Sequence, residues 1–221
     1  NLEKNNILIS YDSGISIRSL PINYDNKHNE LFAHEFQKKI PGCYAKIESK
    51  VYIVDNSICH FFGFGRLSKY SKSSASGRKA KTLRIIKFLK LFQPAQLIPK
   101  GTWVIDDWSS GYFHWFADAL TRAELVSEYT HNYPLILPAE FEDIGYIRKS
   151  LEILGIQYVY LNTKKPSKVE ELLITSYTAP TGNYNKKLLS NLSKRFRGWV
   201  KEEQENTNRS WEDRKRKIYV S

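Results

Sequence analysis

Residues 111–122 hold the side chains of this chain that are best suited to chemistry. His114 and Asp118 lie four residues apart in an aromatic-rich pattern that predicts a helix. Residues at this spacing share one helix face, so an imidazole and a carboxylate would project side by side. Such a pair can accept and pass on a proton, which is general acid–base chemistry. Arg122 would extend the same polar stripe by one more turn.

The same spacing also fits a buried histidine that a carboxylate holds in place for structural reasons alone. Ser109 or Ser110 is the expected N-cap, because both precede the apolar period. The apolar stripe that should anchor this helix to a sheet comprises Phe113, Phe116, Ala117 and Leu120. The polar stripe beside it would then border a cleft. Spacing alone leaves the catalytic and the structural interpretation open.

Five short segments, in order along the chain, resemble glycosyltransferase family 61. The first reads Gly-Tyr-Phe-His-Trp, then Asp118 and Leu-Thr-Arg, as in the family pattern of a small residue, an aromatic, His-Trp, Asp and Leu-x-Arg. The others are a strand ending in proline (134–138), a helix ending in Leu-Gly-Ile (146–156), a strand (169–174) and a Tyr-Val-Ser element (217–221). The resemblance covers roughly residues 101 to 221, and residues 1–100 carry no recognisable motif.

This resemblance implies an inverting glycosyltransferase of the GT-B architecture, which has two Rossmann-like domains. It implies an α/β fold with a doubly wound sheet, and it makes the chain the N-terminal, acceptor-side half. The nucleotide-sugar donor would bind to a C-terminal half that is missing here. The resemblance therefore implies that residues 1–221 bind no cofactor and are inactive alone. The expected acceptor is a polysaccharide or a lipid-linked glycan, as in capsule biosynthesis.

Inversion requires a base that deprotonates the acceptor hydroxyl during a single displacement. Asp118 is the first candidate for this base, and His114 is the second candidate or its partner. Arg122 would hold an anionic group of the acceptor or the donor phosphate. Further expected substrate contacts on the loop and the first helical turn are Asp107, Ser110, Tyr112 and Trp115. No metal site is predicted, because adjacent carboxylates at 106 and 107 need not converge and no zinc spacing occurs.

The net charge of +11 is concentrated in one segment. Residues 66–100 contain ten Lys or Arg and no Asp or Glu. A helix predicted at 80–92 carries cations at every third position: Lys81, Arg84, Lys87 and Lys90. This pattern fits a helix on an anionic membrane surface, and it equally fits a core helix with a solvated basic face. Nucleic acid is a less favoured partner, because no known DNA- or RNA-binding motif accompanies the charge.

The remaining pattern predicts one α/β unit. A hairpin is expected from two β-rich runs, 51–54 and 58–62. After residue 100 strands (103–105, 134–137, 157–161 and 170–175) alternate with helices (111–130, 143–154 and 185–205). We therefore expect an N-terminal strand and loop region with the basic helix (1–100), a Rossmann-like acceptor core (101–205), and a linker into the missing donor domain (206–221).

Two further expectations concern the setting of the protein. Cys43 and Cys59 form no disulfide framework and should be ordinary core thiols. No apolar run is long enough to span a bilayer. The Lys- and Asn-rich, cysteine-poor composition favours a bacterial cytoplasmic protein, and the basic helix would allow peripheral binding to the inner face of the membrane. A non-catalytic carbohydrate-binding scaffold of the same fold is an alternative to the enzyme, and a second Rossmann domain after residue 221 would decide between them.

Overall fold

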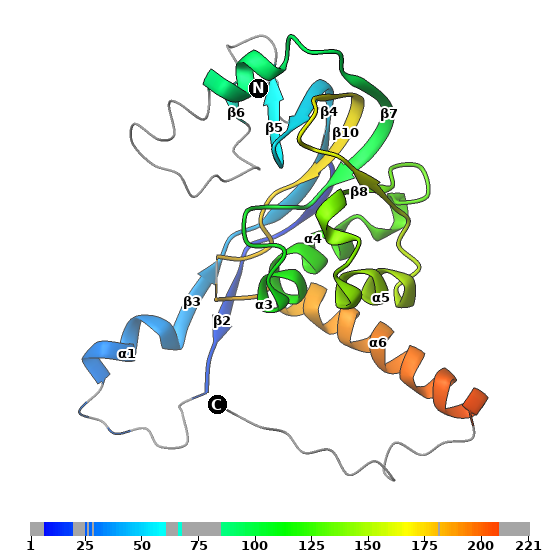
Figure 1. Ribbon diagram of the computed structural model, residues 1–221. Coiled ribbons are helices and arrows are strands. Elements are labelled where there is room, and N and C mark those ends of the chain that lie inside the picture. Colours follow the sequence, from blue (N-terminus) through cyan, green and yellow to red (C-terminus); the bar gives the residue numbers. More distant parts are fainter. Residues whose placement is uncertain are drawn as a thin grey trace.

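Eight strands form one mixed sheet in the part of the chain that the computed structural model describes, residues 7–19, 25, 27, 29–60, 66–67, 85–180 and 182–207. Its strands are β1 (Ile7–Tyr11), β4 (Cys43–Val54), β5 (Ser57–His60), β6 (Arg66–Leu67), β7 (Gln96–Trp103), β8 (Leu135–Pro138), β9 (Tyr158–Leu161) and β10 (Ser167–Thr175). The order is β6-β5-β4-β10-β7-β8-β9, and β1 also pairs with β4 (Figure 1). The fold is therefore mixed α/β.

The sheet has a parallel part and an antiparallel part. Strands β10, β7, β8 and β9 are parallel, whereas β4 is antiparallel to β10, β5 and β1. Because β4 is hydrogen-bonded along its length to β10, the N-terminal region and the later residues share one sheet. The predicted hairpin is confirmed, with β4 and β5 joined at Asp55 and Asn56, both of which have positive φ.

The helices follow the parallel strands. They are α3 (Tyr112–His114), the π-helix η3 (Trp115–Ala119), α4 (Leu120–Leu125), η4 (Ser127–Tyr129), η5 (Ala139–Phe141), α5 (Gly145–Ile153) and α6 (Lys186–Thr207). Figure 1 shows α3, α4, α5 and α6 gathered at one end of the sheet. Between α5 and β9 the Leu-Gly-Ile sequence closes the helix, because Gly155 has φ +60° and the Ile156 N–H donates to the Leu151 carbonyl.

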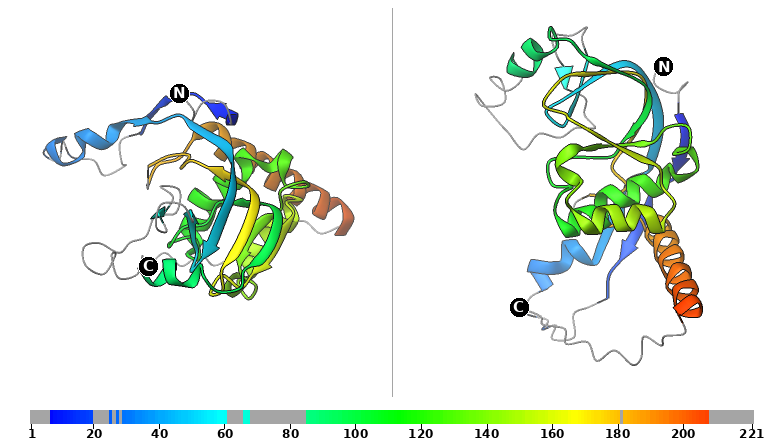
Figure 2. Two further views of the ribbon diagram at one scale, coloured as in Figure 1. Left: turned by 90° about the horizontal axis from the view of Figure 1, so that it is seen from above. Right: turned by 45° about the vertical axis from the view of Figure 1, so that its right-hand side comes forward.

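A smaller sheet of β2 (Gly14–Ile17) and β3 (Gln37–Ile40) carries helix α1 (Asn29–Phe36). These elements form an arm that projects from the rest of the molecule in Figure 1 and Figure 2. Ile15 and Ile17 on the arm are 60% and 71% exposed. The sequence-based prediction contained no such arm.

Strand β7 is longer than predicted and ends where the strand at 103–105 was expected to begin. Strand β7 contains Pro99, although proline lacks the N–H that a sheet ladder uses. Among the described residues β7 pairs with β8 only through Thr102, so Pro99 lies where β7 has no paired residue on that side. The central core is built from the parallel strands, the helices after them and the adjoining β4–β5 hairpin, and it includes Trp103, Trp115 and Ile53.

Candidate functional site

The loop after β7 is fixed by a network around Asp106. The Asp106 carboxylate accepts hydrogen bonds from the Trp108 N–H at 3.0 Å and from the Ser109 hydroxyl at 2.8 Å. The Ser109 oxygen in turn accepts from the Asp106 N–H at 2.9 Å. The Ser109 hydroxyl therefore makes its hydrogen bonds within this turn and does not cap the helix. The prediction of a serine N-cap is wrong. Gly111 occupies the N-cap position, without a side-chain hydrogen bond.

The helix from α3 to α4 brings His114 and Asp118 together. The His114 Nδ1 and Asp118 Oδ2 atoms are 2.7 Å apart, and the two side chains are 26% and 11% exposed. A π-helical turn, η3, begins directly after His114 and contains Asp118. Such turns are rare and often occur at functional sites. The pairing that the spacing predicted is confirmed, and it lies at the carboxyl end of β7.

The protonation of this pair follows from the chemistry of its groups. An ionised carboxylate can only accept hydrogen bonds, so a short contact from Asp118 to Nδ1 requires the proton on Nδ1. The other ring nitrogen of neutral His114, Nε2, then carries a lone pair. No described residue makes a hydrogen bond to Nε2. Trp108 and Phe113 lie beside the imidazole, with ring centroids at 5.6 and 5.4 Å. Asp118 thus fixes the orientation of the His114 ring, and two aromatic rings flank it.

The buried face of this helix differs from the predicted stripe. Phe113, expected in the anchoring stripe, is 56% exposed, whereas Trp115 is fully buried. Trp115 faces α5, and the period of a helix does not say which of its sides such a distant partner will cover. The Trp115 indole N–H donates to the Ser150 hydroxyl on α5 at 2.8 Å. The expectation that Trp115 contacts substrate is therefore corrected, because its ring belongs to the core.

Arg122 is also placed differently from the prediction. It is 1% exposed, and its guanidinium donates to the Thr175 hydroxyl, the Thr175 carbonyl and the Val104 carbonyl at 2.8, 3.1 and 2.7 Å. Burial lowers the pKa of Arg122, while nearby Tyr177, Asp106 and Asp118 act in the opposite direction. Its donors join the ends of β7 and β10. Arg122 is therefore a buried structural residue that links the two strand ends near the His114–Asp118 pair, and a substrate cannot reach it.

The other predicted contact residues remain at the surface. Asp107 and Ser110 are exposed. The Ser110 carbonyl accepts a hydrogen bond from the Tyr146 hydroxyl of α5. Tyr112 is 65% exposed and packs against Tyr146 and Phe116 at centroid distances of 5.1 and 4.8 Å. These residues border the first turn of the helix, as expected, and remain available to a ligand.

Residues 175–178, at the end of β10 and directly after it, complete the surroundings of the pair, and the sequence analysis did not identify them. The Thr178 hydroxyl lies 2.7 Å from the hydroxyl of Thr121, one turn after Asp118. The Arg122 guanidinium lies over the Tyr177 ring at 4.9 Å. The available signal was their position at the end of a strand, since parallel neighbours end at the same sheet edge.

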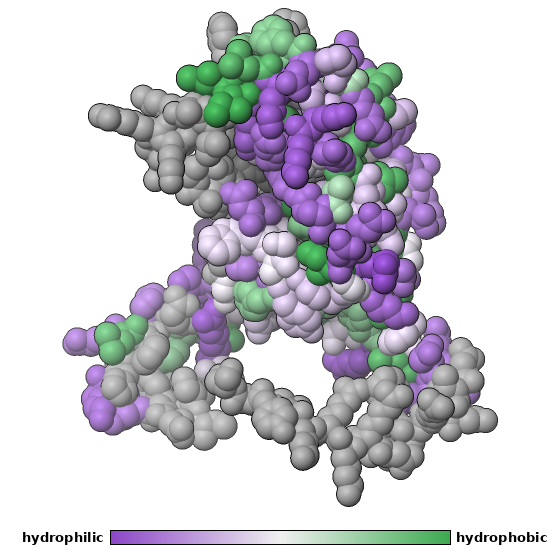
Figure 3. Space-filling view, in the orientation of Figure 1, coloured by the Kyte–Doolittle hydropathy of each residue, from purple (hydrophilic) through white to green (hydrophobic). Residues whose placement is uncertain are grey.

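The prediction that four cations of the basic helix face a membrane is wrong for the two of them that the structure describes, Lys87 and Lys90. Lys81 and Arg84 lie outside the described residues, and the chain is helical at 85–90. Lys87 is 9% exposed and donates to the Ser57 hydroxyl at 2.6 Å. Lys90 forms an ion pair with Asp55 at 2.7 Å. Both cations point at the β4–β5 turn, because there they satisfy its carboxylate and hydroxyl. The exposed side chains are apolar, and Figure 3 shows this patch at the top of the molecule.

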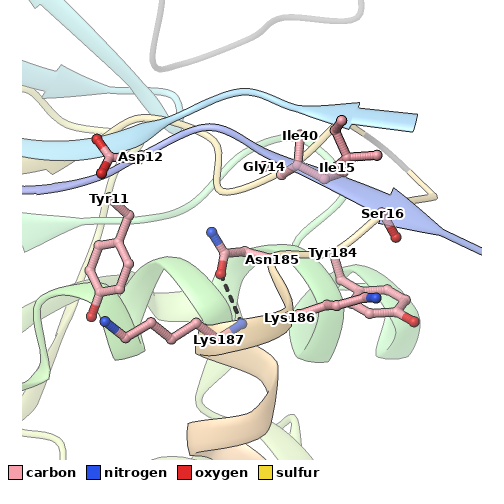
Figure 4. A pocket seen from close by; sticks show the side chains of 10 residues that line it. All are labelled: Tyr11, Asp12, Gly14, Ile15, Ser16, Ile40, Tyr184, Asn185, Lys186 and Lys187. Carbon is pink, nitrogen blue, oxygen red and sulfur yellow. Dashed lines mark hydrogen bonds between the residues drawn. The ribbon is translucent and has the colours of Figure 1, made fainter. Parts of the chain in front are cut away.

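A pocket of about 290 Å³ lies between the first strands and the start of α6 (Figure 4). Its lining residues are Tyr11, Asp12, Gly14, Ile15, Ser16, Ile40, Tyr184, Asn185, Lys186 and Lys187. The sequence pattern gave no indication of it, because its two walls are more than 140 residues apart along the chain.

Neither a metal-ion cluster nor a membrane-spanning helix is found within the described residues. No group of three or more His, Cys, Asp or Glu side chains is placed to hold a metal ion there. In the same part of the chain, no helix combines the length and apolar character that crossing a membrane requires.

Comparison with known proteins gives no neighbour: no protein-family model, curated protein or solved structure matches the chain.

Proposed function

We propose that the protein is the acceptor-side part of an inverting glycosyltransferase that acts on a glycan or lipid-linked acceptor. The observation that carries the proposal is the His114–Asp118 pair, 2.7 Å apart in a π-turn at the carboxyl end of β7. The resemblance of residues 101–221 to family 61 supplies the reaction class. Rossmann-like topology and the division of a GT-B enzyme are part of the same proposal.

The order of the parallel strands supports a Rossmann-like core. In chain order the four strands lie third, second, first and fourth across the sheet, as β9-β8-β7-β10. This is the order in one half of a dinucleotide-binding sheet, whose ligands bind where the order reverses. Here the order reverses between β7 and β10, and His114, Asp118 and Thr178 follow these two strands. The five-residue link from β9 to β10, which contains no helix, departs from the usual doubly wound pattern.

In the proposed reaction His114 is the base and Asp118 orients it, the reverse of the order that the sequence favoured. His114 is the more exposed of the two, and its Nε2 faces no described partner. Nε2 would take the proton of the acceptor hydroxyl as that oxygen attacks the anomeric carbon. The bond from that carbon to the donor phosphate breaks, and the nucleoside diphosphate leaves with the electron pair. Asp118 stabilises the resulting imidazolium.

The test is sugar transfer by the protein expressed from its complete coding sequence. We expect His114→Ala to reduce kcat/KM by about 10²-fold or more. Asp118→Asn should cause a loss of similar size, because an amide can donate to Nδ1 and so select the wrong tautomer. Added imidazole should restore part of the activity of His114→Ala and none of that of Asp118→Asn. Glu202→Gln, an exposed carboxylate on α6, is the matched control and should leave transfer unchanged.

Near-normal transfer by both variants, with folding intact, would return the pair to a structural role. A loss in Asp118→Asn alone would restore Asp118 as the base. Sugar binding without transfer under any condition would favour the alternative of a non-catalytic carbohydrate-binding scaffold.

We further propose that the protein works at an anionic membrane surface. What supports this is an apolar face on the helix after the basic segment: Ile85, Ile86, Leu89 and Phe92 are 60%, 44%, 60% and 65% exposed. Lys87 and Lys90 fix that face outward through their bonds to Ser57 and Asp55. The seven Lys and Arg of residues 66–84 immediately precede it in the sequence. Inserted apolar side chains and nearby cations are the two signals that stable peripheral binding requires.

A further inference from the structure

The pocket in Figure 4 lies where β1 ends, and the register of the main sheet puts this end on the same edge as the carboxyl end of β7, after which the His114–Asp118 pair follows. Register pairs connect the two: Trp103 of β7 faces Ile174, Thr175 faces Ala45, and Cys43 faces Tyr11. Strands β7 and β1 are thus three strand spacings apart across the sheet, or about 14 Å, and β1 continues past the level of Trp103 to Tyr11. A ligand that reaches from one to the other would be an extended chain.

The floor of the pocket carries an unbalanced positive charge. Helix α6 has 22 residues, and its first turn contains Lys186 and Lys187 and no acidic residue. The N-terminus of a helix is itself the positive end of its dipole, so two lysines there are unfavourable without an anion nearby. Asn185 already caps the N–H groups of Lys187 and Leu188, which keeps the helix start ordered.

The described residues place no carboxylate in direct contact with these lysines, although Glu124 and Glu128 act electrostatically on the nearby Tyr11. No ion pair joins either ammonium group to a described carboxylate. Lys187 lies over the Tyr11 ring at 4.6 Å. The two lysines extend in opposite directions from the first turn, and the Asp12 carboxylate points away from α6 (Figure 4).

A second, independent observation is Ser16 on the opposite wall. Ser16 is 5% exposed, whereas its neighbours Ile15 and Ile17 are 60% and 71% exposed. Strand β2 therefore turns a hydroxyl inward at the position where an apolar side chain would normally pack. This hydroxyl has no hydrogen-bond partner among the described residues, and in Figure 4 it points toward the α6 side of the pocket. The Ser16 oxygen is not fully enclosed by protein atoms, so a ligand in the pocket can reach it and form a hydrogen bond with it.

We propose that this pocket binds an acidic saccharide and that it is a second subsite for the acceptor. Lys186 and Lys187 would pair with a carboxylate or phosphate on the sugar, and Ser16 would hydrogen-bond a ring hydroxyl. Tyr184, which is 42% exposed, offers an aromatic face for the sugar ring. The identification of the ligand as the acceptor rests on the proposed function, whereas its anionic and sugar-like character rests on the pocket itself.

Titration calorimetry on the full chain at low salt separates the possible ligands. The probes are a tetrasaccharide that contains glucuronic acid, a neutral glucose tetrasaccharide and inorganic phosphate. We expect the acidic tetrasaccharide to bind at least about tenfold more tightly than either of the others, and to weaken as salt rises. Phosphate binding as tight as that of the acidic sugar, or equal binding of the neutral sugar, would overturn the assignment. So would the absence of binding at millimolar concentration.

Variants of the pocket residues then test whether the acidic saccharide binds in this pocket. Lys186→Gln with Lys187→Gln should weaken the acidic tetrasaccharide about tenfold or more, and Ser16→Ala should weaken it several-fold. The matched control is Lys194→Gln with Lys201→Gln, which removes the same charge from exposed positions on the same helix and should not affect binding. The pocket variant without ligand should keep its Tm, because its lysines oppose the helix dipole. A lower Tm with unchanged affinity would show that the lysines are structural, and the proposal would fail.

One further variant separates this inference from the proposed reaction. Asp118→Asn should bind the acidic tetrasaccharide as tightly as the unmodified chain. Unchanged binding with lost transfer supports both proposals. Unchanged transfer with intact binding overturns the reaction and leaves the subsite standing.

Discussion

At the scale of single residues, burial decides what a charged side chain can do. Arg122 and His114 are eight residues apart on one helix, yet one guanidinium is 1% exposed and the imidazole is 26% exposed. Arg122 has three protein acceptors within hydrogen-bond distance and no access to solvent. The Nδ1 atom of His114 is bonded to Asp118, whereas its Nε2 atom has no hydrogen-bond partner among the described residues. The first arrangement stabilises the loop ends, and the second is suited to proton transfer.

Arg122 gives a prediction about stability. Arg122→Met removes three hydrogen bonds from a charged donor and leaves the Val104 and Thr175 acceptors buried without partners. We expect the free energy of unfolding to fall by about 3 kcal/mol or more. Denaturant unfolding measures this. Arg197→Met, which changes an exposed arginine of α6, is the control and should stay within about 0.5 kcal/mol of the unmodified chain.

Cys59 gives a prediction about pH. Burial raises the pKa of the Cys59 thiol to about 11, from an ordinary value of 9.0. Between these values the folded state keeps the thiol proton and the unfolded state has lost it, so stability falls as pH rises from about 9 to 11. The loss reaches about 2–3 kcal/mol by linkage. Cys59→Ala should remove this part of the pH slope, measured against the unmodified chain. Parallel slopes would contradict the prediction.

At the scale of elements, the helix at 85–90 shows that an amphipathic pattern does not say which face is turned outward. Its apolar residues suit a core and its cations suit solvent, yet Lys87 and Lys90 are drawn to the β4–β5 turn. Asp55 supplies a carboxylate and Ser57 a hydroxyl at that turn. Leu91 and Phe88 pack on the same hairpin, which leaves four other apolar side chains exposed.

This arrangement predicts how membrane binding would respond to mutation. We expect the chain to co-sediment with anionic liposomes, to bind neutral ones weakly, and to lose binding as salt rises. Leu89→Gln with Phe92→Gln should weaken binding without unfolding the protein. Ile17→Gln with Leu31→Gln removes exposed apolar side chains from the arm and is the matched control. Salt-sensitive binding to duplex DNA without preference for lipid would favour the nucleic-acid alternative.

At the scale of the whole molecule, the main sheet combines segments from both ends of the described chain. Strand β4 lies between β5 and β10, and α6 packs against α4, where Arg195 forms an ion pair with Glu124 at 2.5 Å. The parallel strands therefore do not form an independent layer. The proposed reaction lies at their carboxyl edge, and the proposed subsite lies on the same side of the sheet at the end of β1.

The proposed split into an acceptor half and a donor half makes a prediction about nucleotide-sugar binding by this chain. If residues 1–221 form the acceptor side, calorimetry with a panel of nucleotide sugars should show no binding at sub-millimolar concentration. The acidic tetrasaccharide is the positive control in the same preparation. A clear micromolar affinity for any nucleotide sugar would place the donor pocket within these residues, and the assignment of an acceptor half would be wrong.

The sequence by itself determined the features that depend on local periodicity. Helices α5 and α6 and strands β8 and β9 lie within a few residues of their predicted bounds. The His114–Asp118 contact was predictable because both groups belong to one helix. The burial of Cys43 and Cys59 is confirmed as well, and both are free thiols.

Only the tertiary structure decided which of these groups are exposed and which distant segments meet. The burial of Arg122 depends on Thr175, which is 53 residues away, and the orientation of Lys87 depends on Ser57. Sequence periods carry no information about such partners, because strand order and register are set by contacts between segments far apart in the chain. For the same reason the pocket between Ser16 and Lys186 could not be foreseen, because its two walls come from segments far apart in the sequence.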